Sequence, residues 1–250
     1  MIRVTSYGSG SKGNLYLVSN ANTKIVLECG FEIDYINRVL NQNRLLYKDI
    51  NACITSHCHN DHSMSIKHFD NYNIPCYCTY DTKLRYDLSE ENFKQLVDNR
   101  VYKINDIQVM TLSVNHGQCE CFGFIFKDKD SLILFITDFM ECKKNLQPFP
   151  FDEIFIECNY LDYMWEIRKE TNVANEELDR KYRRQINTHQ NLCNLIIHLN
   201  RMNLRKCDKI TLIHISQDLG DMEEMTKEIE EEFGIECVAL MPNGKEYYAN

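Results

Sequence analysis

Residues 56–62 read SHCHNDH, which places three histidines and an aspartate within six positions of one another. His57 and His59 stand two positions apart, so an extended backbone would turn both rings to the same side. Asp61 and His62 then begin a turn into a helix and can face a second metal ion. Imidazole nitrogens and carboxylate oxygens are the ligands that Zn²⁺ prefers and that Mn²⁺ and Fe²⁺ accept. The stretch therefore predicts a metal site.

Three later residues stand where further metal ligands are expected. His116, Asp138 and His214 each come at the end of an apolar run. A strand that ends in this way can deliver a polar side chain to a shared cleft. Since residues 57–62 alone cannot fill the coordination shells of two ions, these three residues complete a predicted two-metal site.

The first half of the chain alternates short apolar runs with turns, which predicts many short strands. Helical spacing recurs between some of the runs, so strands and helices are interleaved and the fold class is α/β. The predicted helices cover Ile33–Leu40, the residues after His62, and Glu90–Val97. The predicted strands cover Ile2–Ser6, Leu15–Val18, Lys24–Leu27, Ala52–Thr55, Pro75–Thr79, Ile107–Val114, Phe122–Lys127 and Leu132–Ile136.

The second half contains longer helical patterns. After a short strand at Ile154–Ile156, the apolar residues of Asn175–Asn200 form the stripe of one or two helices. A last strand is predicted at Lys209–His214. A last helix is predicted at Asp221–Phe233, where an acidic face opposes an apolar one and Gly234 stands at the position of a C-cap.

The composition restricts the class of protein. The chain has 250 residues, 44% hydrophobic and 26% charged, which fits one globular domain spanning residues 1–250. No run reaches the roughly 18–20 apolar residues of a membrane span, and residues 1–10 lack a signal-peptide pattern, so we expect a cytoplasmic protein without membrane contact. Most of the 12 cysteines are then expected to be reduced thiols. The net charge of −9 argues against a surface that coats nucleic acid, so an anionic substrate must be captured locally.

The order of these motifs resembles the metallo-β-lactamase-fold hydrolases over nearly the whole chain. Residues 7–14, YGSGSKGN, are similar to the SGSxGN opening of the YycJ-type branch of small single-domain exonucleases. The resemblance implies an αββα sandwich, with two facing sheets between outer helices, and a dinuclear site at one edge beside this glycine-rich turn. It also implies the ligands: His57, His59 and His116 for one metal, Asp61, His62 and His214 for the other, and Asp138 bridging both.

The chain departs from the family pattern at two places. Glu28 stands where the family has an aspartate, one methylene shorter, which leaves open whether it hydrogen-bonds the ligand loop. Thr188-His189-Gln190-Asn191 shares only His and Asn with the late Gly-His-Leu-Ser-Asn segment of the branch, so His189 is a weaker candidate.

The ligand set predicts a metal-dependent hydrolase in which metal-bound hydroxide is the nucleophile. Two Zn²⁺ ions are expected as cofactors, or Mn²⁺ in their place. Asp61 is then both ligand and catalytic residue, while Cys58, between two ligands, is expected to point away and to be structural. His189 and the basic segment Arg180–Arg184 favour a phosphodiester substrate, either nucleic acid or a small linear or cyclic nucleotide, with His189 and Arg184 on the phosphate.

Several alternatives remain at this point. Ester or thioester hydrolases of the lactonase and glyoxalase types share these ligands, and a regulatory module could keep the fold without turnover. Cys76 with Cys78 and Cys119 with Cys121 could compose a four-sulfur zinc site, although coincidental packing on strands is favoured. Tyr160, Tyr163 and Trp165 are expected in the core rather than stacking on a base. The sequence leaves the oligomeric state open, a homodimer included.

Overall fold

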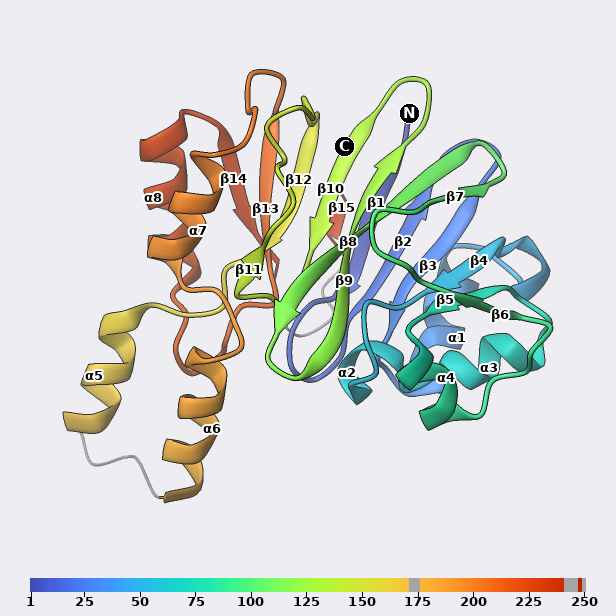
Figure 1. Cartoon of the computed structure of the whole chain (residues 1–250), viewed down its shortest axis with the longest axis horizontal. Coiled ribbons are helices and arrows are strands. Elements are labelled where there is room, and N and C mark those ends of the chain that lie inside the picture. The colour runs from blue at the N-terminus through green and yellow to red at the C-terminus, as the bar shows by residue number, and fades with distance from the viewer. Residues whose placement is uncertain (171–175, 241–246, 249–250) are drawn as a thin grey trace.

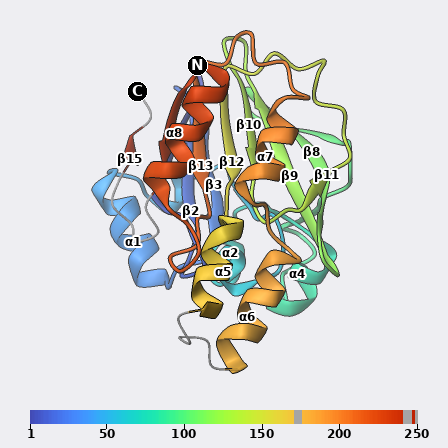
Figure 2. The same cartoon turned by 90° about the vertical axis from the view of Figure 1, so that its left-hand side faces the viewer.

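Two β-sheets face each other in the computed structural model, with helices on both outer sides (Figures 1 and 2). The structure describes residues 1–170, 176–240 and 247–248. In Figure 1, α1 and α3 lie outside one sheet, and α7 and α8 outside the other. This arrangement confirms the predicted α/β class and the αββα sandwich.

The first sheet has the strand order β15-β1-β2-β3-β4-β5-β6. The strands from β15 to β3 pair antiparallel, and those from β3 to β6 pair parallel. The parallel part therefore points the carboxyl ends of β3 and β4 to the same edge. The bounds are β1 Arg3–Gly8, β2 Leu15–Ser19, β3 Lys24–Cys29, β4 Ala52–Ile54, β5 Cys76–Cys78, β6 Phe93–Gln95 and β15 Tyr247–Tyr248.

The second sheet has the order β11-β8-β9-β10-β12-β13-β14, and β7 also pairs with β8. Its strands from β8 to β10 are antiparallel, and those from β10 to β14 are parallel. Here too the parallel strands bring their carboxyl ends to one edge. The bounds are β7 Val101–Ile104, β8 Ile107–His116, β9 Cys119–Lys127, β10 Leu132–Ile136, β11 Glu141–Cys142, β12 Glu153–Glu157, β13 Lys209–Ile213 and β14 Glu236–Ala239.

A central core fills the space between the sheets. The inner faces of the sheets contribute β-branched and aromatic residues to this core. The rings of Tyr16 from β2 and Phe135 from β10 pack edge to face, with their centroids 4.9 Å apart. Two further apolar clusters lie outside the sheets, one under α1 and α3 and one under α7 and α8. Burial of both faces of each sheet explains why so many strands read as continuous apolar runs.

The helices follow the apolar spacing in most places. The predicted stretch Asn175–Asn200 forms two helices, although Asn175 and the side chain of Leu178 lie outside the described residues. Gly234 ends the last helix with φ 66°, as a left-handed C-cap requires. No helix in the described ranges is both long and apolar enough to cross a membrane. The bounds are α1 Ile33–Gln42, α2 Asn60–Ser63, α3 Ile66–Asn71, α4 Tyr80–Tyr86, α5 Asp162–Glu170, α6 Glu176–Ile186, α7 Leu192–Leu199 and α8 Met222–Phe233, with a 3₁₀ turn at Tyr47–Asp49.

The predicted helix at Glu90–Val97 is wrong. These residues contain strand β6, which pairs with β5 at the edge of the first sheet. The apolar residues that suggested helical spacing include Leu96, which is buried in the central core. Pairing to a neighbouring strand outweighs the local pattern here, because strand preference depends on the packing partner.

The paired cysteines do not form a common zinc site. Cys76 and Cys78 are buried under α3 in the outer cluster of the first sheet, whereas Cys121 belongs to the outer cluster of the second. Of the three aromatic residues expected in the core, Tyr160 and Trp165 are buried, but Tyr163 is 44% exposed on α5. None of those three lines the pocket of about 640 Å³ that opens at one edge of the sheets.

Candidate metal centre

A pocket of about 640 Å³ opens at the edge where parallel strands of both sheets end. From the second sheet, Asp138 follows β10, Glu157 is the last residue of β12, and His214 follows β13. From the first sheet, β4 leads into the histidine-rich stretch. The ends of parallel strands in α/β proteins are the usual place for a ligand, and the fold delivers polar side chains to that place from both sheets.

One group of potential metal ligands is made by His57, His59, His116 and Asp138. Their nitrogen and oxygen ligand atoms all lie within 4.8 Å of one another. His57 Nε2 lies 2.8 Å from His59 Nδ1 and 3.7 Å from Asp138 Oδ2. The carbonyl of Thr188 accepts from His116 Nδ1 at 3.0 Å, which leaves His116 Nε2 as the coordinating atom, 3.5 Å from Asp138 Oδ2.

A second group is made by Asp61, His62 and His214, also within 4.8 Å. Asp61 Oδ2 lies 3.5 Å from His62 Nε2 and 3.6 Å from His214 Nε2. His214 Nε2 is buried and has no hydrogen-bond partner in the part of the chain that the structure describes. A buried nitrogen without a partner is costly unless it coordinates an ion, so this group fits a metal.

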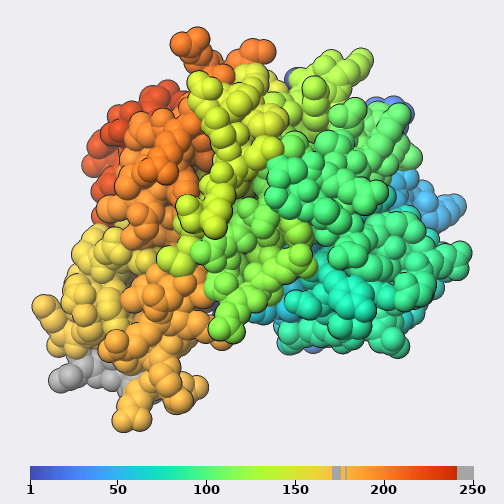
Figure 3. All heavy atoms as spheres, in the orientation of Figure 1, coloured from blue at the N-terminus to red at the C-terminus, as the bar shows by residue number. Residues whose placement is uncertain are grey.

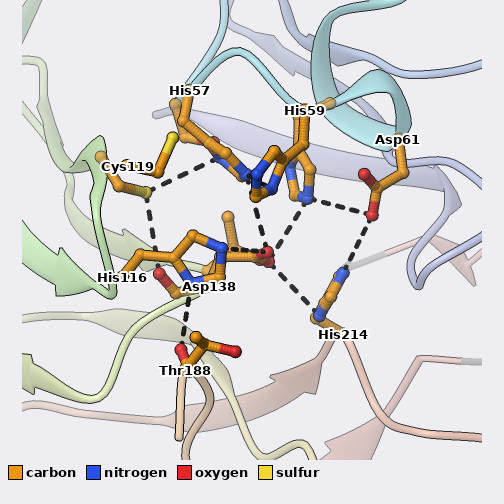
Figure 4. A network of polar contacts seen from close by, with 12 residues as sticks. His57, His59, Asp61, His116, Cys119, Asp138, Thr188 and His214 are labelled. Atoms are coloured by element: carbon orange, nitrogen blue, oxygen red, sulfur yellow. Dashed lines mark hydrogen bonds and ion pairs between the residues drawn. The ribbon is translucent and has the colours of Figure 1, made fainter. Parts of the chain in front are cut away.

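Asp138 stands between the two groups, as Figure 4 shows. Its Oδ2 faces His57 and His116, while its Oδ1 lies 3.3 Å from both His62 Nε2 and His214 Nδ1. One carboxylate thus presents one oxygen to each group. This is the geometry expected of a residue that bridges two ions.

The two groups differ in their electrostatics. Burial lowers the pKa values of His57, His59 and His116, so these rings are neutral and their lone pairs are available. Burial opposes the charging of His214 as well, but Asp138 and its neighbouring carboxylates raise its pKa to about 10. An ion entering the second group must therefore displace a proton.

Two buried glutamates hold the ligands in place. Glu28 accepts from the backbone N–H of Ser56 at 3.2 Å and lies 3.5 Å from His62 Nδ1, so the longer side chain still supports the ligand loop. Glu157 accepts from Phe139 N–H at 2.9 Å and contacts the Nδ1 atoms of two histidines, His189 at 2.7 Å and His214 at 3.0 Å. The sequence prediction missed Glu157, although it ends an apolar run just as Asp138 and His214 do.

The glycine-rich turn lies beside these groups, as expected. Asn14 donates from its side chain to the carbonyl of Asp61 at 3.0 Å, and Ser9 Oγ accepts from His214 N–H at 2.8 Å. Gly30 packs directly under the ligand loop, and a Cβ there would lie 1.8 Å from the Asp61 carbonyl oxygen. Only glycine permits this approach.

Left-handed backbone recurs at three site residues. Glu28, Asp138 and His214 have φ values of 59°, 47° and 54°. Each residue stands at the end of a central strand. Residues other than glycine adopt this conformation at a cost, and such strain gathers at functional sites.

His189 and Arg184 both line the same pocket as the ligand groups. His189 also belongs to a third group of potential ligands with Asp138, Glu157 and His214. Elsewhere in the basic segment, Lys181 pairs with Asp218 at 2.9 Å, and Arg183 pairs with Asp179. Arg184 is therefore the member of this segment that the structure brings to the pocket.

Cys58 also lines the pocket, contrary to the expectation that it points away. It is half-buried, and its sulfur lies 3.9 Å from that of Cys119, the first residue of β9. The local chain departs from strict alternation here because α2 begins at Asn60, directly after the second histidine.

Comparisons with known proteins agree with this architecture. A family model described as the beta-lactamase superfamily domain matches residues 23–203. A metallo-beta-lactamase fold protein, YhfI from Bacillus subtilis, superposes with a TM-score of 0.72 at 16% identity, covering 99% of each chain. A metallo hydrolase, Igni18 from Ignicoccus hospitalis, superposes with a TM-score of 0.67 at 8% identity, again over 99% of each chain.

A diphosphatase of the PhnP family is also similar, with a TM-score of 0.65 at 15% identity over 100% of this chain and 98% of its own. Identities this low establish a common fold and nothing finer. A comparison with curated protein sequences finds no match. The family match extends over most of the chain and includes the histidine-rich stretch, His116 and Asp138, and the chain therefore belongs to the beta-lactamase superfamily, with the metallo-beta-lactamase fold.

Proposed function

We propose that the protein is a dinuclear metal-dependent hydrolase of phosphodiester bonds, nuclease-like or acting on small linear or cyclic nucleotides. The observation that carries the proposal is that Arg184 and His189 line one pocket with both ligand groups. An arginine beside a two-metal site suits an anionic phosphoryl group better than a neutral ester.

In this proposal His57, His59 and His116 would hold one ion, and Asp61, His62 and His214 would hold the other. Asp138 would contribute one carboxylate oxygen to each. Zn²⁺ fits this mixture of imidazole and carboxylate ligands best, and Mn²⁺ fits it as well. Bound divalent ions would activate a water molecule and withdraw charge from a phosphoryl oxygen.

The side chains of the protein divide the remaining work. Asp61 is 25% exposed at the pocket and holds its charge, since His62 and His214 outweigh its burial and lower its pKa. Its carboxylate can accept a hydrogen bond from the attacking water and so orient it. Glu157 fixes His189 through Nδ1, so Nε2 is the atom available to a substrate oxygen.

Arg184 supplies the positive charge for the phosphoryl oxygens. It is exposed at the end of α6, and no carboxylate among the described residues lies within 4.0 Å of its guanidinium. Five N–H donors in a fixed fork match two phosphoryl oxygens. One structural relative is described as a diphosphatase, which agrees with phosphorus chemistry at this kind of site.

The experiment compares three alanine variants: His189→Ala, Arg184→Ala, and Arg183→Ala as the matched control, because Arg183 pairs with Asp179 away from the pocket. Substrates are bis(p-nitrophenyl) phosphate, a dinucleotide, a cyclic nucleotide and the neutral ester p-nitrophenyl acetate. We expect the first two variants to keep their metal content and to lose about a hundredfold in kcat/KM on phosphodiesters. The control should change less than twofold.

Three results would contradict the proposal. Unchanged phosphodiester cleavage in both pocket variants would make Arg184 part of a solvated helix face. Faster hydrolysis of the ester than of every phosphodiester would favour ester or thioester chemistry, and metal binding without turnover of any substrate would favour a regulatory module. Membership of the YycJ-type branch, a cytoplasmic location, one domain over residues 1–250 and a homodimer stay predictions from the sequence.

A further inference from the structure

A second arginine, Arg85, reaches the pocket from α4. It lines the pocket together with Asn60, the residue between the ligands His59 and Asp61. Arg85 donates from Nη2 to Asn60 Oδ1 at 2.8 Å, and the Tyr86 hydroxyl donates to the same oxygen at 3.0 Å. A neutral amide therefore fixes the guanidinium one residue away from two of the metal ligands.

Arg85 forms no ion pair with any residue that the structure describes. Among the described residues no carboxylate lies within 4.0 Å of its guanidinium, whereas Lys83 on the same helix pairs with Glu90. The same contrast holds on α6, where Arg183 pairs with Asp179 but Arg184 has no such partner. Arg85 and Arg184 thus both face the pocket without an ion pair among the described residues, in a chain of net charge −9.

The two arginines approach the pocket from different sides. Figure 3 shows α6 and the α4 region separated on this face by the tip of the β8–β9 hairpin, and in Figure 1 the two helices flank the strand ends. The remaining charged lining residues include Asp61, Asp81 and Asp138, which repel an anion from the rest of the wall. An anionic group that does not contact the metal ligands is thus directed to one of two positions, Arg184 or Arg85.

We propose that Arg85, held by Asn60, binds a second phosphate that is not cleaved. This inference rests on the proposed function and narrows its substrate class to nucleotide chains with at least two phosphates. The phosphodiester to be cleaved lies at the metal groups with Arg184, and a neighbouring phosphate lies at Arg85. The pocket has a volume of about 640 Å³, which is more than a single phosphodiester group needs. It can therefore accommodate a ligand with two phosphates.

The test measures binding and cleavage of three thymidine dinucleotides on the metal-loaded protein. One has no terminal phosphate, one has a 5′-phosphate and one has a 3′-phosphate. The proteins are wild type, Arg85→Ala, Arg85→Lys, and Arg100→Ala as the matched control. The guanidinium of Arg100 lies over the ring of Tyr102, just as that of Arg85 lies over Tyr86, but Arg100 does not line the pocket. Calorimetric binding uses dinucleotides with a phosphorothioate linkage, which slows turnover.

We expect a terminal phosphate on at least one end to tighten binding to wild type and Arg100→Ala by about tenfold, and to Arg85→Ala by less than twofold. Arg85→Lys should recover part of the gain, since it keeps the charge but not the fork. Bis(p-nitrophenyl) phosphate, which has one phosphate, should be cleaved by Arg85→Ala within twofold of the wild-type rate.

Other outcomes would overturn either the role of Arg85 or the proposed function. No gain from a terminal phosphate in wild type, or a full gain in Arg85→Ala, would overturn the role of Arg85. An equal loss on all substrates would make Arg85 structural and would also overturn it. If wild type cleaves no phosphodiester but the tenfold binding gain depends on Arg85, the proposed function fails while the second phosphate position stands.

Discussion

Asp138 combines two unusual properties in one residue. Its backbone has a φ of 47°, and its two carboxylate oxygens face different groups of histidines. Thr137 donates from its hydroxyl to Asp138 Oδ1 at 2.9 Å, and burial is outweighed by His214 and His62, which hold the pKa of Asp138 well below its usual range. The side chain is therefore a fixed carboxylate available to both groups at neutral pH.

This geometry predicts different effects for two aspartates on metal content. We expect wild type to bind two metal ions per chain, Asp61→Ala about one, and Asp138→Ala less than one, because Asp61 contacts one ligand group and Asp138 contacts both. Equilibrium dialysis against Zn²⁺ followed by elemental analysis measures the stoichiometry. Equal occupancy in both variants, or a single ion in wild type, would contradict the bridging role.

The candidate ligands could be predicted from sequence because their chemistry is visible locally. His57, His59 and Asp61 lie close together in the chain, and His116 ends an apolar run. Arg85 could not be predicted, because its contact with Asn60 exists only when α4 packs beside α2. A contact between residues far apart in sequence leaves no periodic signal.

At the scale of elements, the short helix α3 is joined to the segment before β6 by one buried carboxylate. Asp70 accepts from Lys67 Nζ at 2.9 Å, from the amide of Asn92 at 2.9 Å, and from the backbone and hydroxyl of Ser89. Its side chain is only 3% exposed. These contacts attach the edge of the first sheet to the helix that follows the ligand loop.

The same contacts predict a pH-dependent contribution to stability. Burial would raise the pKa of Asp70, but its hydrogen bonds from Ser89 and Asn92 lower it to about 2. Since the folded pKa is below the ordinary value, the contribution is full above about pH 4 and is lost as the pH falls through 2. We expect Asp70→Asn to lower the free energy of unfolding by about 2 kcal/mol at pH 7.

Urea unfolding at pH 7 and pH 3 measures this effect. The difference between wild type and Asp70→Asn should be smaller at pH 3. The control is Asp34→Asn at an exposed position of α1, for which we expect a change within about 0.5 kcal/mol. A difference for Asp70→Asn that is the same at both pH values would show that its charge does not contribute.

At the scale of the whole molecule, the candidate ligands come from both sheets. His57 and Asp61 follow β4 of the first sheet, while His116, Asp138 and His214 belong to the second. Bound ions would therefore join the two sheets at one edge of the central core. A group that binds only the folded state adds to its stability.

Metal removal is expected to lower the melting temperature of the wild-type protein. At a free Zn²⁺ concentration of about 100 times Kd, one bound ion adds about 2.7 kcal/mol to the free energy of unfolding. For a chain of this length, this raises the melting temperature by about 5–10 °C. Thermal melts with EDTA and after Zn²⁺ addition measure the change, and Asp138→Ala should respond much less. Identical melting temperatures with and without Zn²⁺ in wild type would contradict metal binding to the folded state.

Much of the sandwich could be predicted because apolar runs mark buried strands such as β10 and β12. The short edge strands β6, β7 and β14 were not predicted, because a strand of three or four residues with exposed side chains has no distinctive pattern and is defined by its partner. Helix α4 is short and mostly exposed as well. It is the element that carries Arg85 to the pocket.

The order of the ligands along the chain has a consequence for biosynthesis. On the ribosome, the residues of the first ligand group are complete once Asp138 has emerged, whereas Asp61 and His62 wait until His214 has been synthesised as well. The nascent chain thus acquires its two coordination shells at different times. A cell that is short of metal during synthesis would accumulate chains loaded at the early position and still empty at the late one.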